Sequence, residues 1–140
     1  MRVRRVETDA GREDAFAVRR RVFVEEQGVP EDLEMDGRDD DAVHFVAYDD
    51  GPVAAARLRE PDPGVGKVER VAVLAERRRE GIGRAVVARV ESVAADRGVD
   101  RLRLHAQTSV ESFYRKLGYE TTSDAFQEAG IDHVEMEKGL

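Results

Sequence analysis

The feature that most constrains the fold is a short apolar strand that runs through charged residues into a Gly-x-Gly turn and a helix. The strand begins near Val71, the turn is Gly81-Ile-Gly83, and apolar residues then recur at helical spacing. Glycine lacks the Cβ atom that keeps a ligand off the main chain, and the first amides of a helix have no partner within it. The pattern predicts an anion-binding helix start, for which a phosphate-bearing ligand is the natural occupant. A plain strand-to-helix turn would use the same glycines, so further signals are needed.

Two common phosphate motifs do not fit the chain. There is no Gly-Lys-Ser/Thr of a P-loop, and the third glycine and the later acidic residue of a dinucleotide fingerprint have no good match. ATP and NAD are therefore not expected. The length of 140 residues and the 41% hydrophobic content predict one domain, 1–140, with a true core.

Composition excludes several classes of function. The chain has no cysteine, which removes disulfides, thiolate metal sites and a cysteine nucleophile. Its histidines, His44, His105 and His133, fall in separate predicted strands without zinc-ligand spacing, so no metal is expected and structural roles are favoured. No apolar run approaches the roughly 20 residues of a membrane span, and the N-terminus lacks a signal peptide's apolar stretch. We expect a soluble, cytoplasmic protein that binds no membrane.

The charge balance is acidic and poor in lysine. Thirty acidic residues face 23 basic ones, for a net charge of −7, and only three residues are lysines. Such a surface opposes binding to nucleic acid, including through Arg77-Arg-Arg79, which has no aromatic residues interleaved with it. It resembles the acidic surfaces of proteins adapted to high salt, where screening makes dense negative charge tolerable.

Periodicity predicts a single α/β unit without repeats or linkers. We expect strands at 2–7, 42–48, 52–59, 68–74, 101–107 and 133–136. We expect a helix from Thr8 or Asp9 to about residue 24, a second at 82–97, and a third that Thr108-Ser-Val-Glu111 opens as a capping box and Gly118 ends. Residues 31–41 should form an acidic loop or short helix. The turn Asp49-Asp50-Gly51-Pro52 predicts an antiparallel hairpin.

Two motifs together resemble the GNAT superfamily of acetyl-CoA-dependent N-acetyltransferases. Arg78-Arg-Glu-Gly-Ile-Gly83 resembles its Gln/Arg-x-x-Gly-x-Gly/Ala signature, and Phe113-Tyr-Arg-Lys-Leu-Gly-Tyr119 resembles its Phe-Tyr-x-x-x-Gly-Phe/Tyr signature. Segments 21–30 and 126–133 resemble the ElaA-like branch, so the likeness covers nearly all of the chain. It implies an α/β fold with a mixed, mostly antiparallel twisted sheet of about six or seven strands, about four helices, and splayed central strands.

The resemblance also implies a cosubstrate, acetyl-CoA, and where it binds. The backbone of the strand before the glycines would bind the pantetheine arm, and the following amides would bind the pyrophosphate, with arginine side chains adding contacts. The residues that match these roles are Val71, Ala72, Val73, Arg78, Arg79, Gly81, Ile82, Gly83 and Arg84. An arginine in this run could equally belong to a solvated surface.

Acetyl transfer to an amine needs a deprotonated amine, an oxyanion donor and an acid for the departing thiolate. Tyr114 matches the family tyrosine that serves as this acid, although packing beside Phe113 would also explain it. The oxyanion donor would be a backbone N–H near Val73. Glu69 is a weak candidate for a general base, and loss of the amine proton to solvent is an alternative that needs no base.

The acceptor is the least constrained inference. Acids of segment 25–41 would attract a cationic amine, and His133 matches the ElaA-like pattern, although Asp132 stands where that pattern has proline. The candidate acceptor residues are Glu26, Gln27, Glu34, Asp36 and His133, with ordinary acidic surface as the alternative for the acids. A small-molecule or peptide amine would be acetylated. A non-catalytic acyl-CoA-binding module remains the alternative function, and the oligomeric state, a homodimer included, stays open.

Overall fold

One mixed sheet of eight strands organises the chain. The computed structural model describes residues 1–140, and neighbouring strands follow the order β1-β2-β3-β4-β5-β8-β6, with β7 paired to β8. The strands are β1 (Arg2–Arg5), β2 (Val43–Tyr48), β3 (Pro52–Asp62), β4 (Val65–Val73), β5 (Arg101–Gln107), β6 (Glu120–Thr121), β7 (Phe126–Glu128) and β8 (Ile131–Gly139). Every pairing is antiparallel except that of β4 with β5. The mixed, mostly antiparallel α/β sheet expected from the resemblance is confirmed.

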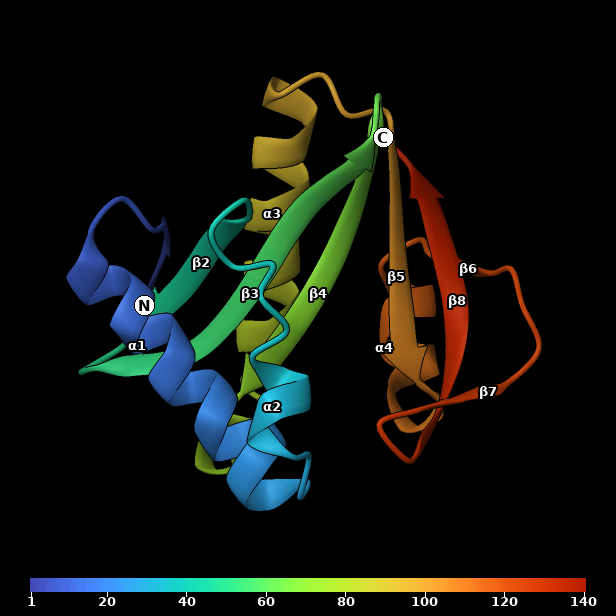
Figure 1. Ribbon diagram of the computed structural model, residues 1–140. Coiled ribbons are helices and arrows are strands. Elements are labelled where there is room, and N and C mark those ends of the chain that lie inside the picture. Colours follow the sequence, from blue (N-terminus) through green and yellow to red (C-terminus); the bar gives the residue numbers. More distant parts are fainter.

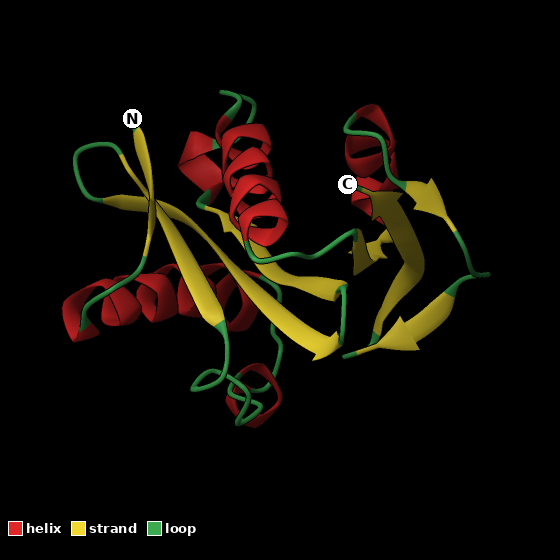
Figure 2. Cartoon of the chain, turned by 90° about the horizontal axis from the view of Figure 1, so that it is seen from above, coloured by secondary structure: helices red, strands yellow, loops and turns green.

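Helices cover both faces of this sheet (Figures 1 and 2). The helical elements are α1 (Asp9–Arg19), the π-helix η1 (Arg20–Glu26), α2 (Glu31–Glu34), the 3-10 turn η2 (Ala75–Arg77), α3 (Ile82–Asp96), the 3-10 turn η3 (Thr108–Val110) and α4 (Glu111–Lys116). Helices α1 and α2 lie on one face, and α3 and α4 lie on the other. No helix is both long and apolar enough to cross a membrane.

Two buried clusters sit on the two faces of the sheet. The larger packs the apolar face of α3 against β2 to β5, and includes Val86, Val90, Leu58, Val68 and Leu104. The smaller packs α1 against the other face through residues such as Ala15 and Val18. Leu58 of β3 and Val68 of β4 are paired, and both side chains face α3. Because side chains alternate along a strand, the residues directly before and after each of them face the α1 side. That side carries the polar residues of the site.

Local signals placed most elements correctly. The Thr8 hydroxyl accepts from the Gly11 amide at 3.1 Å and caps α1 as expected. The hairpin between β2 and β3 is confirmed, and Asp50 and Gly51 in its turn both have positive φ, a conformation that an Asp-Gly pair favours.

Three details of the predicted elements were wrong. The helix expected to about residue 24 changes into the π-helix η1. The spacing of apolar residues does not determine whether each amide donates to the carbonyl four or five residues before it. The expected capping box is not formed: Thr108 starts a 3-10 turn, and α4 has no side-chain cap. The short strands β6 and β7 were missed, since three residues or fewer carry no measurable alternation.

Candidate functional site

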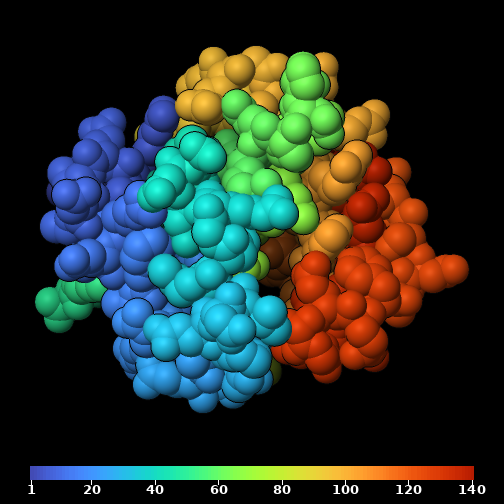
Figure 3. Space-filling model, in the orientation of Figure 1, coloured from blue at the N-terminus to red at the C-terminus, as the bar shows by residue number.

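The central strands β4 and β5 diverge and open a cavity. They pair only from Val65–Val68 to Arg101–Leu104, and beyond Val68 the two strands separate (Figure 1). A cavity of about 1250 Å³ lies between them, and Figure 3 shows its hollow between the segment around α2 and the segment around β7. At the apex the strands are close, since a Cβ on Gly66 would lie 2.8 Å from Leu102 Cδ2. The splayed central strands expected from the resemblance are present.

The start of α3 presents free amides at one end of this cavity. Gly81 is the N-cap with φ +84°, and a Cβ built on it meets no atom within 4 Å. The first intrahelical hydrogen bond runs from the Ala85 amide to Gly81 O at 3.2 Å, so the amides of residues 82–84 have no acceptor within the helix. Arg79 also has positive φ, +66°. The turn therefore combines open space, unpaired N–H groups and the positive end of the helix dipole, which suits a diphosphate.

Arg78 links this turn to the strand edge and to η1. Its Nε donates to Val73 O at 3.0 Å, and its two terminal nitrogens bind the Glu26 carboxylate at 2.6 and 2.7 Å. The hydrogen bond to Glu26 lowers the pKa of that carboxyl below its usual range. Since N–H and C=O of one strand residue point to the same edge, the Val73 amide also faces the gap.

Tyr114 lies deep in the cavity wall. It is 7% exposed, and its ring packs edge-on against Phe113 and Tyr119. Burial is the sole cause that raises the pKa of its phenol well above the usual range, with no hydrogen bond contributing. The hydroxyl therefore stays protonated at neutral pH and keeps its donor free for a ligand.

The cavity brings together every residue that the sequence predicted for the site. The predicted residues that line it are Val71, Ala72, Val73, Arg78, Arg79, Gly81, Ile82, Gly83, Arg84, Tyr114, Glu69, Glu26, Gln27, Glu34, Asp36 and His133. Gln27 also spans the gap, because its side-chain oxygen accepts from Gln107 Nε2 at 2.9 Å. Proximity alone does not give each residue the role expected of it, and three of the acids have a different one.

Glu69 is unsuited to act as a base. Burial alone would raise the pKa of its carboxyl, but the hydrogen bond from Arg59 and the charge of Arg57 outweigh that effect and lower its pKa to about 2. A third cation, Lys67, also lies near this carboxylate, with its Nζ 3.4 Å from Glu69 Oε2. A carboxylate stabilised in this way is a weak proton acceptor at neutral pH, so the geometry opposes the candidate role as general base.

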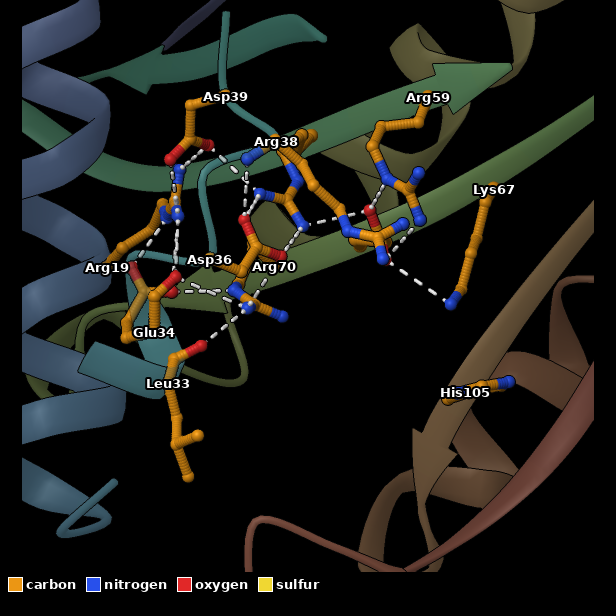
Figure 4. A network of polar contacts seen from close by, with 12 residues as sticks. Arg19, Leu33, Glu34, Asp36, Arg38, Asp39, Arg59, Lys67, Arg70 and His105 are labelled. Carbon is orange, nitrogen blue, oxygen red and sulfur yellow. Dashed lines mark hydrogen bonds and ion pairs between the residues drawn. The ribbon is translucent and has the colours of Figure 1, made fainter. Parts of the chain in front are cut away.

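Glu34 and Asp36 belong to an ion-pair network rather than to a free acidic surface (Figure 4). The network joins five cations to four carboxylates: Arg19, Arg57, Arg59, Lys67, Arg70, Glu34, Asp36, Asp39 and Glu69. Glu34 is 3% exposed and receives donors from Arg19 and Arg70. Asp36 binds Arg57 through both carboxylate oxygens, at 2.9 and 2.8 Å. Their charges are compensated, so these two acids do not present the attraction for a cation that the sequence suggested.

His133 faces the cavity from β8 with a defined ring orientation. Its Nδ1 lies 2.8 Å from Ile131 O, and a carbonyl oxygen can only accept, so Nδ1 carries the hydrogen. In the neutral ring Nε2 then has the lone pair. Glu128 Oε2 lies 3.7 Å from Nε2, and Glu128 Oε1 lies 3.0 Å from His105 Nδ1. The Glu128 carboxylate therefore lies beside both imidazole rings.

Several lining residues escaped the sequence analysis. They are Arg38, Arg59, Lys67, Arg70, His105, Gln107 and Glu128. Arg59, Lys67, His105 and Gln107 each follow a buried residue along their strands, the usual pattern of a solvated face. The missing strand partner beyond Val68 turns that face into a cavity wall. No group of three or more His, Cys, Asp or Glu side chains is arranged to hold a metal ion.

Comparison with known proteins gives consistent relatives. Residues 6–140 match the family model described as "Acetyltransferase (GNAT) domain". The uncharacterized N-acetyltransferase YjcF of Bacillus subtilis is 44% identical over 127 residues, which are 89% of this chain and 90% of that protein. Protein ElaA of Escherichia coli is 29% identical over 120 residues, 82% of this chain and 78% of that protein. A crystal structure from Lactobacillus plantarum, described as a candidate N-acetyltransferase, superposes with a TM-score of 0.93 at 32% identity and covers 99% of this chain and 97% of its own.

Proposed function

Because this chain belongs to the GNAT acetyltransferase family, in which ElaA is a relative, we propose that it transfers the acetyl group of acetyl-CoA to a primary amine in a ternary complex. The observation that supports this proposal most is a single cavity that contains both the open N-terminus of α3 and the buried hydroxyl of Tyr114. An aminoglycoside 6'-N-acetyltransferase solved with coenzyme A has the same fold, with a TM-score of 0.79 at 17% identity.

The residues around α3 fit a CoA molecule. The unpaired amides of residues 82–84 would receive the diphosphate, and the guanidinium groups of Arg79 and Arg84 would add charge beside it. The gap-facing edge of Val71–Val73 would bind the pantetheine amides as an added strand would. Arg78 Nε donates a hydrogen bond to Val73 O in this structure, so that bond would have to break before the pantetheine arm could bind this carbonyl oxygen.

Acetyl-CoA supplies an acetyl group activated as a thioester. The amine nitrogen forms the new N–C bond and the C–S bond breaks. The Val73 amide would donate to the carbonyl oxygen as it gains negative charge. Tyr114 would act as the general acid for the departing sulfur: its phenol keeps its proton at neutral pH, so its hydroxyl can donate to the thiolate as the C–S bond breaks. His133 Nε2, which lies 3.7 Å from Glu128 Oε2, would accept the proton that the amine loses.

Release of free thiol from acetyl-CoA tests the proposal, measured with a panel of primary amines. Tyr114→Phe removes only the hydroxyl and keeps the ring that packs on Phe113 and Tyr119, so it should fold normally. We expect the turnover rate to fall by about 10²- to 10⁴-fold, the usual contribution of a general acid. CoA affinity should stay the same. Tight CoA binding without turnover of any amine would instead support a non-catalytic acyl-CoA-binding module.

A further inference from the structure

The cavity is more basic than the chain that forms it. Eight basic and five acidic side chains line it, whereas the whole sequence has 23 basic and 30 acidic residues. Arginines at the start of α3 account for half of the basic residues and suit the phosphates of CoA. The other half, Arg38, Arg59, Lys67 and Arg70, lie elsewhere on the wall and have no such explanation.

These four cations lie on the face of the sheet opposite α3. Arg59 and Lys67 pair across β3 and β4, and each alternates with a core residue that packs toward α3. Figure 4 shows the side chain of Lys67 extending into the space between β4 and β5, with His105 on β5 below it. The start of α3, where CoA is proposed to bind, lies on the other face of the sheet. A second substrate would therefore approach the thioester from the face that carries these cations.

The carboxylate oxygens of this wall already accept hydrogen bonds from neighbouring side chains and amides. Glu69 Oε1 accepts from Arg57 and Arg59 at 2.9 and 2.6 Å. Each oxygen of Asp36 accepts two hydrogen bonds, and each oxygen of Glu34 accepts at least one from a guanidinium. A cationic ligand would find few free acceptors on these side chains.

The cations, in contrast, have donors left over. Lys67 Nζ makes one ion pair at 3.4 Å and is 22% exposed. The Nη1 atoms of Arg59 and Arg70 have no hydrogen-bond partner, because the contacts of both guanidinium groups run through Nε and Nη2. Arg38 is exposed, and only its backbone amide is engaged, with Asp36. Excess donors and positive charge are the features that recognise an anionic oxygen group.

We propose that the acceptor amine carries a carboxylate or a phosphate on the same molecule, and that Lys67, Arg59 and Arg38 bind this anionic group. This inference rests on the proposed function, because it names the substrate class of that site. It also reverses the attraction for a cation that the acidic sequence of segment 25–41 suggests. The acceptor is then an amino acid or an amino-phosphate compound rather than a polyamine.

Matched substrate pairs test the proposal. Each common amino acid is compared with its own carboxamide, and O-phosphoethanolamine with ethanolamine, by thiol release from acetyl-CoA. We expect the preferred anionic compound to exceed its neutral partner at least tenfold in kcat/KM. The amide's amine is less basic and more often deprotonated at neutral pH, so intrinsic reactivity favours the amide and makes an acid preference a stringent result. A preference confined to the phosphate pair would assign a phosphate.

Three variants locate the recognition. Lys67→Gln should reduce the preference for the anion at least tenfold, mainly through KM, and leave CoA affinity unchanged. Arg38→Gln should act in the same direction, and this exposed side chain has no ion pair whose loss would disturb folding. Lys116→Gln is the matched control, since it removes the same charge from an exposed position that does not line the cavity.

Calorimetry of the same compounds with CoA-loaded protein separates two kinds of failure. Binding of an anionic compound that depends on Lys67, without turnover of any amine, would refute the proposed function and keep only the anion-binding role of Lys67. Turnover of neutral amines without an acid preference, or equal behaviour of Lys67→Gln and Lys116→Gln, would refute this inference and keep the proposed function. The absence of both binding and turnover for every anionic compound would refute the inference as well.

Discussion

Two glycines at the two ends of α3 allow a matched test of the proposed diphosphate site at residues 82–84. Gly81 precedes the helix with φ +84°, and Gly98 follows it with φ +83°. A Cβ at either position meets no atom within 4 Å, so alanine causes no clash at either site and only the strain of positive φ remains. That strain is about 1–2 kcal/mol for an L-residue. The melting temperature should fall by roughly 3–10 °C in Gly81→Ala and by a similar amount in Gly98→Ala, at roughly 3–5 °C per kcal/mol for this chain length.

The two variants should differ in CoA binding. In Gly81→Ala the added methyl group occupies the open space before the free amides of residues 82–84, where the diphosphate is proposed to bind. Loss of one charge-assisted hydrogen bond is worth about 1.5–3 kcal/mol, or about 10- to 100-fold in Kd. Calorimetric titration below both melting temperatures measures the difference. Equal CoA affinity in Gly81→Ala and Gly98→Ala would refute the reasoning.

Three further outcomes follow from the site and the apex of the strands. Glu69→Gln should leave the shape of the pH–rate profile between about pH 5 and 8 unchanged, because the pKa of Glu69 is about 2 and the group is ionised throughout; loss of a limb of the profile would restore a role as base. The folded-state pKa of Glu69 lies below its usual 4.5, so this carboxylate stabilises the fold above pH 4.5, and that contribution should be lost as pH falls toward 2. Urea denaturation at several pH values measures this loss. A free energy of unfolding that does not fall over this window would contradict the ion-pair assignment. Gly66→Ala places a methyl group 2.8 Å from Leu102 Cδ2 and should cost about 1–3 kcal/mol in urea denaturation, whereas an unchanged stability would mean that the apex of the strands can widen.

The sequence predicted the part of the cavity around the start of α3 better than the wall opposite it. Gly81, Gly83 and the apolar face of α3 are local signals, because backbone conformation and helical periodicity depend on neighbours in the chain. Tyr114 was found through a motif four residues before a glycine. Each of these residues lines the cavity.

The opposite wall depends on contacts between distant segments, which local patterns do not record. Arg19 is fully buried although arginine rarely is, and its partners Glu34 and Asp39 lie 15 and 20 residues away. From sequence alone the acids looked like free negative charge. Only the fold shows that buried arginines neutralise them and that Lys67 retains its donors. Charge at a site follows from such pairing and not from the count of acids in a segment.

The central claim is that the main-chain amides at the start of α3 hold the diphosphate of CoA while the open edge of β4 holds its pantetheine arm. Titration of ¹⁵N-labelled protein with CoA, followed through backbone amide resonances, tests this claim most directly. The account predicts saturable shifts that are largest at residues 82–84 and 71–73. Shifts that do not saturate, or that centre on residues outside the cavity, would contradict it.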